Sequence, residues 1–465
     1  MQSSEEPTSF CPYYPHPRKD KATLWKMFFS ARHSWLDALY ERSYRMKLGE
    51  VHLPGLDLYM VNDPKIVNRV MSDTAALFPK SPLLGLALKP LLGESIFTTN
   101  GRQWERQRHM MDPAFAQARL SVAFPVMNAA VDDMSLRLAA LPDNVEHDLE
   151  VEMTHVTADI IFRTIFSQPM EGEDARRIFK AFARFQALAP RLMLPSLFGM
   201  RWLVWPWDIW RSRRAALEIR RLLEKILRPR HVAYLQGCPG QPIDILQSFM
   251  EARDPETNVP FQFEELVDQV AMLFLAGHET SASALTWACH LLAHRDDIQQ
   301  RMHAEIAALG NLQTLQPGDI KSLELTRNVF RETLRLFPPV GFIARQAQAA
   351  CPIGKKQIPA DATIVVAPWL IQRHRKYWRM PDHFDPDRFN SADARASLSQ
   401  AYLPFGMGPR VCLGAAFALQ EATLILARLV KDFQLTPVLG HTPIPVGRLT
   451  IRSANGVRLR LKRRS

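Results

Sequence analysis

Apolar residues recur at intervals of three and four along most of the chain, which is the spacing of amphipathic helices. Asp63-Pro64 supplies the cap and the first residue of a short helix through about Met71. Longer helices are predicted near residues 102–111, 115–140, 148–167, 173–188, 211–235, 262–294, 297–309, 321–336 and 415–430. The pattern predicts a mainly helical protein.

Strand-like alternation is confined to short segments. Strands are expected near residues 48–53, 57–62, 363–367 and 457–462. Pro54-Gly55 separates the first two and predicts a hairpin. Residues 1–20 are polar and rich in proline, which predicts an extended arm. Because no repeat or flexible linker interrupts the rest, residues 21–465 are expected to form one large domain, mainly α with small β-sheets.

The most apolar stretch, residues 270–294, is long enough to resemble a membrane span. His278 and Glu279 lie at its centre, however, and hydrocarbon strongly disfavours a carboxylate. The stretch is therefore predicted to be a long core helix that begins near Phe263.

The charge and cysteine content limit the kinds of binding partner and structural site that are expected. Lys and Arg outnumber Asp and Glu by 58 to 47, so the net charge of +11 favours an acidic partner. The basic ending RLRLKRRS alternates as a solvated strand does, and no nucleic acid is expected. The five cysteines include no C-x-x-C pair, which argues against a disulfide framework or a structural zinc site. With no signal peptide in MQSSEEPTSF, a cytoplasmic location is expected.

The candidate chemistry centres on residues 405–414, FGMGPRVCLG. Its glycines permit a tight loop that brings the backbone close to a flat or bulky group. Cys412 ends the loop and leads into an apolar helix, whose N-terminus favours the thiolate that a soft metal ion requires. The alternative is an inert buried cysteine.

The pattern F-x-x-G-x-R-x-C-x-G in this loop resembles the heme-binding loop of the heme-thiolate monooxygenases, the cytochrome P-450 superfamily, in its soluble bacterial form. The resemblance implies that superfamily's fold and a heme b whose iron takes the Cys412 thiolate as its axial ligand. It also implies that Arg410 binds a heme propionate and that Phe405 packs near the sulfur and tunes its electron donation.

Other motifs follow in the superfamily's order. Glu332 and Arg335, in RETLRLFPP, and Arg388, in PDHFDPDRF, resemble its buried Glu–Arg–Arg network, although an E-x-x-R pair alone is usually a solvated contact. Trp104, Arg108 and Arg345 fall where the resemblance implies further propionate partners. A surface arginine beside a core tryptophan is the alternative for Trp104 and Arg108.

Residues 276–280, AGHET, interrupt the long helix with poor helix formers. Thr280 is expected to bond to the carbonyl oxygen four residues earlier and so to loosen the helix beside a cavity. The motif resembles the superfamily's oxygen groove, in which Glu279 and Thr280 would be the acid–threonine pair that relays protons.

The implied function is oxygen insertion into a lipophilic substrate, with dioxygen as co-substrate. NAD(P)H would supply electrons through a separate ferredoxin or flavodoxin-type donor and its reductase, with Arg102 and Arg106 as candidate docking residues. A heme-thiolate sensor or ligand-binding protein without turnover is the alternative.

The substrate pocket is expected to be apolar. The candidates are Leu83, Leu84, Leu86 and Leu88, placed in a loop, with Ile96, Phe97, Phe274, Ala276, Val340, Phe342 and Ile343. Such a lining favours a long-chain fatty acid, with a terpenoid or a steroid as alternatives.

Residues 192–210 and the helix after them are expected to form the lid over this pocket. Trp202, Trp205, Trp207 and Trp210 crowd the first part. The helix places Ile219, Leu222, Leu223, Ile226 and Leu227 on one side and Arg213, Arg220, Arg221, Lys225 and Arg228 largely around the other. The lid either packs on its own core or makes peripheral contact with an anionic membrane.

Overall fold

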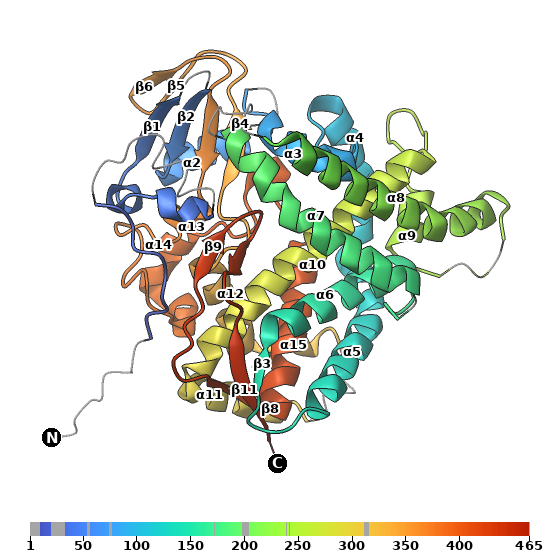
Figure 1. Ribbon diagram of the computed structural model, residues 1–465, viewed down its shortest axis with the longest axis vertical. Helices are drawn as coiled ribbons and strands as arrows, with labels where there is room; N and C mark the ends of the chain where they lie inside the picture. The colour runs from blue at the N-terminus through green and yellow to red at the C-terminus, as the bar shows by residue number, and fades with distance from the viewer. Residues whose placement is uncertain are drawn as a thin grey trace.

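The computed structural model describes residues 10–19, 33–53, 56–73, 77–171, 173–197, 204–238, 240, 242–310 and 316–464. The α-helices within the described residues are α2 (Pro64–Ser72), α3 (Pro82–Leu92), α4 (Gly101–Met111), α5 (Gln117–Ala139), α6 (Leu149–Phe166), α7 (Glu173–Leu197), α8 (Pro206–Leu235), α9 (Ile245–Glu251), α10 (Phe263–Ala293), α11 (Asp296–Ala307), α12 (Glu324–Leu336), α13 (Pro368–Ile371), α14 (Ala392–Ala401) and α15 (Ala415–Asp432). The expected fold class, mainly α with small sheets, is confirmed (Figure 1).

Helix α10 is the centre of the molecule. It runs through the helical body and packs against α6, α8, α12 and α15, and nearly all of its side chains are buried (Figure 1). A helix that is apolar on every side is stable only inside a core. Among the described residues, no helix combines the length and the apolar character that crossing a bilayer requires.

The sheets lie at the margins. The strands are β1 (Leu48–Leu53), β2 (Leu56–Val61), β3 (Glu146–Asp148), β4 (Ile343–Gln346), β5 (Cys351–Ile353), β6 (Lys356–Ile358), β7 (Thr363–Val366), β8 (Phe433–Pro437), β9 (Pro445–Gly447), β10 (Ile451–Ser453) and β11 (Arg458–Arg463). One sheet has the order β1-β2-β7-β4 and another the order β3-β11-β8, at opposite ends of the molecule (Figure 1). The two strands of the predicted hairpin, β1 and β2, pair antiparallel from Leu48↔Val61 to Leu53↔Leu56, and the predicted turn residues 54 and 55 lie outside the described residues.

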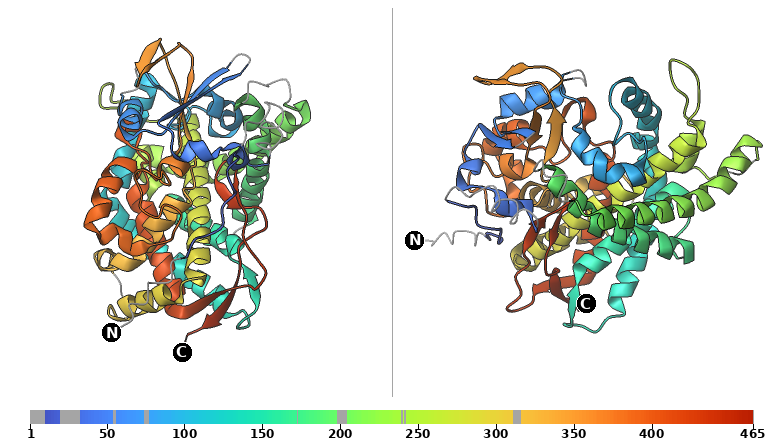
Figure 2. Two further views of the ribbon diagram at one scale, coloured as in Figure 1. Left: turned by 90° about the vertical axis from the view of Figure 1, so that its left-hand side faces the viewer. Right: turned by 45° about the horizontal axis from the view of Figure 1, so that its top comes forward.

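The segment from Leu83 to Leu88 was expected as a loop, and that expectation is wrong. It belongs to α3, because the Ser81 side chain caps the amide of Leu83 and Pro82 occupies the first helical position. Helices α7 and α8, which lie side by side over α3 and α10, are also longer than predicted (Figure 2).

The predicted Glu–Arg–Arg residues lie together in the core. The Glu332 carboxylate, with no exposed surface, accepts two hydrogen bonds of 2.8 Å from Arg335 and one of 3.1 Å from Arg388. Arg335 also donates to the carbonyl oxygens of Pro381 and His383. The network therefore fixes the segment that leads toward the Cys412 loop.

Replacing Arg335 should destabilise the fold severely, because Glu332 would keep a buried charge with fewer donors. We expect Arg335→Met to lower the free energy of unfolding in urea by about 3–5 kcal/mol. The control is Arg301→Met, which removes an exposed pair with Asp387 and should cost less than about 1 kcal/mol. Equal losses in the two variants would contradict a structural role for the network.

Candidate functional site

The Cys412 loop is shaped by two glycines. Gly406 and Gly408 both have φ of +72°, a conformation that side chains rarely adopt. A Cβ atom on Gly408 would also lie 2.3 Å from the carbonyl oxygen of Met71 in α2. The amide of Cys412 donates to the carbonyl oxygen of Phe405, 3.0 Å away, and closes the loop immediately before α15.

The Cys412 side chain is exposed, although protein atoms surround it closely. Burial raises the pKa of Cys412, while the backbone N–H of Gly414 and the positive charge of Arg108 oppose that rise. An isolated thiol here would hold its proton, so the thiolate requires a bound cation such as a metal ion.

The middle of α10 contributes an accessible face. From Leu266 to Ala293 its side chains are buried except at Ala276, Gly277 and Thr280, which share one side of the helix. The predicted hydrogen bond from the Thr280 hydroxyl to the carbonyl oxygen of Ala276 is present at 2.6 Å. Thr280 is therefore the hydroxyl that this face presents.

Glu279 points elsewhere, to a partner that the sequence did not indicate. Both of its carboxylate oxygens accept hydrogen bonds from Arg452, at 3.0 and 2.5 Å, and Thr450 donates a further one of 2.6 Å. Burial alone would raise the pKa of Glu279, but Arg452 and its hydrogen bonds hold it below its ordinary value. Glu279 is thus ionised and held by β10 and the residue before it.

A second buried carboxyl, that of Glu421 on α15, contacts α10 two residues beyond Glu279. Ser281 donates a hydrogen bond of 2.7 Å to Glu421 of α15. Glu421 has no cationic partner among the residues that the structure describes, and burial raises its pKa to about 8, so it carries its proton at neutral pH. This neutral carboxyl joins the two helices that the site depends on.

Three basic side chains gather on the other side of the loop. Lys80 and Arg345 face each other across an isolated β-bridge, and Arg410 lies beside them. Burial, together with Arg410 and Arg345, lowers the pKa of Lys80 to about 6, and burial with Arg410 lowers that of Arg345 to about 10. Among the described residues none of the three forms an ion pair, and one terminal nitrogen of Arg410 is buried without a hydrogen bond.

The predicted propionate residues separate into two groups. Arg410 stacks on Trp104, with its guanidinium carbon 4.5 Å from the ring centre, and donates to Asn100. Arg108 instead binds Asp112 and the carbonyl oxygen of Val411, at 2.7 and 2.8 Å, so it braces the loop from outside.

These features fit a heme. Buried or half-buried basic side chains without acidic partners suit the propionates, and an accessible thiol before a helix N-terminus suits the iron. Lys80, Arg345 and Arg410 would hold the propionates and Cys412 the iron.

The expected pocket residues differ in their exposure. Leu83 and Leu88 are buried on α3, and Ile96, Phe97, Val340, Phe342 and Ile343 are half-buried or exposed. Phe274 instead lies fully buried among Phe162, Phe182 and His278. The side chains of Leu84 and Leu86, and Trp202, lie outside the described residues.

Lys80, Asn100, Thr450, Arg452 and Glu421 were not predicted. Each acts through a contact with a segment distant in sequence, and no motif or periodicity marks such a contact. The one local feature that marks Lys80 in the sequence is its position directly before the helix cap Ser81-Pro82.

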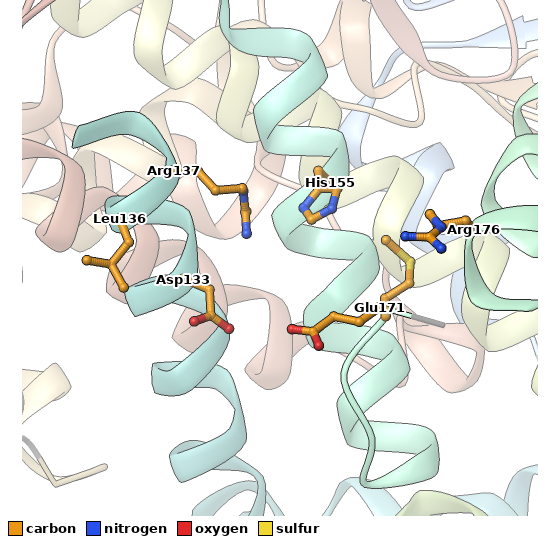
Figure 3. Close-up of a pocket in the computed structure, with 7 residues that line it drawn as sticks. Asp133, Leu136, Arg137, His155, Glu171 and Arg176 are labelled. Carbon is orange, nitrogen blue, oxygen red and sulfur yellow. The ribbon is translucent and has the colours of Figure 1, made fainter. Parts of the chain in front are cut away.

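A surface depression of about 460 Å³ lies elsewhere, between α5, α6 and the segment before α7 (Figure 3). Its labelled residues are Asp133, Leu136, Arg137, His155, Glu171 and Arg176. Asp133 is paired with Arg163, and Arg137 with Glu152. The lining includes no residue of α10 or of the Cys412 loop, so the depression is separate from the site.

Comparisons with known proteins agree with this geometry. A family model described as cytochrome P-450 matches residues 20–453. Cyclooctatin synthase of Streptomyces melanosporofaciens is 30% identical over 84% of each chain, and cyclooctat-9-en-7-ol 5-monooxygenase of the same organism is 29% identical over 85% of this chain and 84% of its own. Pentalenene oxygenase of Streptomyces avermitilis is 28% identical over 90% of both chains.

Lys80 should help to retain the prosthetic group. Because a hydrogen bond to a charged group contributes about 1.5–3 kcal/mol, Lys80→Met should lose heme to apomyoglobin about tenfold faster than the wild type. An anion raises the low pKa of Lys80, so heme binding takes up a proton above about pH 6. Wild-type heme loss should therefore accelerate from pH 7 to pH 9, and this acceleration should be smaller in Lys80→Met.

The control is Lys355→Met, which replaces an exposed lysine of the β5–β6 turn. It should match the wild type at both pH values. Identical heme loss from Lys80→Met and Lys355→Met would remove Lys80 from the propionate site.

Proposed function

Since the chain belongs to the cytochrome P-450 family, we propose that this heme-thiolate monooxygenase inserts oxygen into a C–H bond of a neutral terpenoid. The observation that carries the proposal is the apolar lining. Phe342 and Ile343 are apolar and half-buried, and none of the expected pocket residues whose side chains are described carries a positive charge that could bind a fatty-acid carboxylate. Arg220, expected on the solvent side of α8, is itself held by Asp268.

The relatives support the same substrate class. The names of two relatives specify cyclooctat-9-en-7-ol and pentalenene, which are terpenoids. Burial of such a ligand against apolar side chains supplies about 25 cal/mol per Å². A long-chain fatty acid, which the sequence favoured, is the second candidate, and relatives named as oxygenases disfavour a sensor without turnover.

When bound, heme supplies the dioxygen and electron chemistry, and the protein supplies orientation and protons. Thr280 places a hydroxyl on the accessible face of α10, where it can pass a proton into the cavity. Glu279 is ionised and bound to Arg452, so it must leave Arg452 before its carboxylate can exchange a proton with Thr280. The ion pair is therefore a control point for proton delivery.

The electron donor is proposed to be an acidic ferredoxin or flavodoxin. Val411, next to Cys412, is 37% exposed, so the loop reaches the molecular surface there. Arg102 has an exposed side chain, and within the described part of the chain it pairs only with exposed Glu256, a contact that a docking partner can replace. Arg106 is less suitable than the sequence suggested, because Glu265 holds it with a bond of 2.6 Å.

The lid is proposed to make peripheral contact with an anionic membrane. Trp205, Trp207 and Trp210 are 69%, 53% and 48% exposed at the start of α8. Arg211 and Arg214 stack over the second and third indoles. Indoles and guanidinium groups together suit the interface of an anionic bilayer.

A ligand panel tests the substrate class. Sesquiterpene and diterpene alcohols should shift the heme spectrum with dissociation constants at least about tenfold below that of dodecanoic acid, because the carboxylate lacks a counter-charge. Product formation with NADPH and a surrogate ferredoxin system should follow the same order. Binding and turnover of dodecanoic acid alone would establish the second candidate instead.

Thr280→Ala should uncouple electron use from product formation. Removing the hydroxyl should lower product formed per NADPH consumed by about tenfold or more, with heme content and ligand binding preserved. Thr286→Ala is the matched control, because Thr286 makes the same bond to its own helix but lies in the core. Equal coupling in the two variants would mean that protons arrive by another route.

Vesicle sedimentation tests the lid. Replacing Trp207 and Trp210 with alanine together should abolish retention on phosphatidylglycerol vesicles, and high salt should weaken retention of the wild type. Leu439→Ala, which removes an apolar side chain that is 98% exposed elsewhere, should leave retention unchanged. A wild-type protein that fails to sediment with these vesicles would contradict the proposed contact.

A further inference from the structure

The indole ring of Trp35 is wedged between two backbone segments. Trp35 begins the short helix η1 (Trp35–Ala38), and its ring lies between Gly341 and Gly447. A Cβ atom on Gly341 would lie 2.2 Å from Cζ2 of Trp35, and one on Gly447 would lie 2.4 Å from Nε1. The ring therefore fills the gap between the two backbones, and only glycine leaves room for it.

The wedge is held from both sides. The hydroxyl of Ser34 accepts a hydrogen bond of 2.8 Å from the amide of Gly447 and also caps η1. The indole meets Phe342 edge to face, with ring centres 5.4 Å apart and an angle of 86°. Such a pair favours one relative orientation of its rings.

The first backbone segment, residues 339–343, leads to the substrate side. Phe342 packs against Ala87 of α3, and so do Val204, which precedes α8, and Ile209 in the first turn of α8. Ile343 lies next to the Cys412 loop, 3.7 Å from the Cβ position of Gly406. This segment therefore connects the lid with the loop.

The second segment, β9 and β10 with the turn between them, leads to the acid. Thr450 and Arg452 hold Glu279. The carbonyl oxygen of Ile451 accepts hydrogen bonds from Ser283 and Trp287 of α10, and its amide donates to Pro339 in the first segment. The two segments are thus joined beside Trp35.

We propose that Trp35 is a positioning residue for substrate specificity, which sets the spacing of residues 339–343 and 445–452 and so fixes the shape of the cavity at Phe342. Trp35 acts through these segments and needs no contact with the substrate. Loss of the indole would leave a void that the segments close only in part. A displacement of about 1 Å at a wall that orients the substrate is enough to change which carbon reacts.

The inference rests on the family's heme cavity but not on the proposed terpenoid. Azoles that bind the heme iron report cavity shape without turnover, so the probes are imidazole and the bulky clotrimazole. The quantity measured is the ratio of their dissociation constants in the holoenzyme. Failure of the terpenoid proposal alone would leave this ratio unaffected.

Trp35→Ala should change the clotrimazole-to-imidazole ratio by about tenfold, with imidazole affinity within about twofold of the wild type. Trp35→Phe should change it less, and it carries the test if the alanine variant fails to retain heme. Tyr13→Ala, which removes a 41% exposed aromatic side chain from the N-terminal arm, is the control and should behave as the wild type.

A double-mutant cycle separates positioning from general destabilisation. Gly447→Ala should change the ratio strongly while Trp35 is present, because the new methyl group meets the indole. In the Trp35→Ala background the same substitution should have little effect, so the two changes should not add. Unchanged ratios in Trp35→Phe and Gly447→Ala, or additive effects in the cycle, would overturn the proposal.

Discussion

The rest of the structure depends on the hydrogen bonds and ion pairs of the buried Glu332 carboxylate. It has no exposed surface, and every donor that satisfies it comes from α12 itself or from the segment around residues 385–388. Arg335 and Arg388 also donate hydrogen bonds to backbone carbonyl oxygens between residues 372 and 383. A buried charge needs several precisely oriented partners, so this irregular segment can adopt only one path. That path delivers the chain to the loop where Cys412 lies.

The two sides of the site differ in whether their ionisable side chains have partners of opposite charge. On the α10 side, Glu279 is ionised by Arg452, whereas Glu421 remains neutral because burial raises its pKa and Ser281 supplies only a hydroxyl. On the other side, Lys80 and Arg410 have no acidic partner among the described ion pairs. The protein thus compensates the charge of Glu279 and leaves the basic side chains around Arg410 without acidic partners among the described residues, where the proposed propionates would bind.

Local patterns predicted the elements better than the contacts between them. The helix around Thr280 and its bond to Ala276 follow from periodicity and hydroxyl chemistry, and both were predicted. The helix that contains Leu88 was missed because its cap, Ser81-Pro82, was not recognised as a helix start. Arg452 could not be assigned to Glu279, because nothing local in the sequence records a contact between a central helix and a late strand.

The contact between Arg452 and Glu279 has a consequence for biosynthesis. Glu279 is translated long before Arg452, so a nascent chain that has completed α10 still lacks the counter-charge for a buried carboxylate. The central helix can therefore reach its final packing only after β10 has left the ribosome. The final packing around Glu279 therefore depends on a residue that is synthesised 173 positions after it, although most of the helices that surround Glu279 are synthesised earlier.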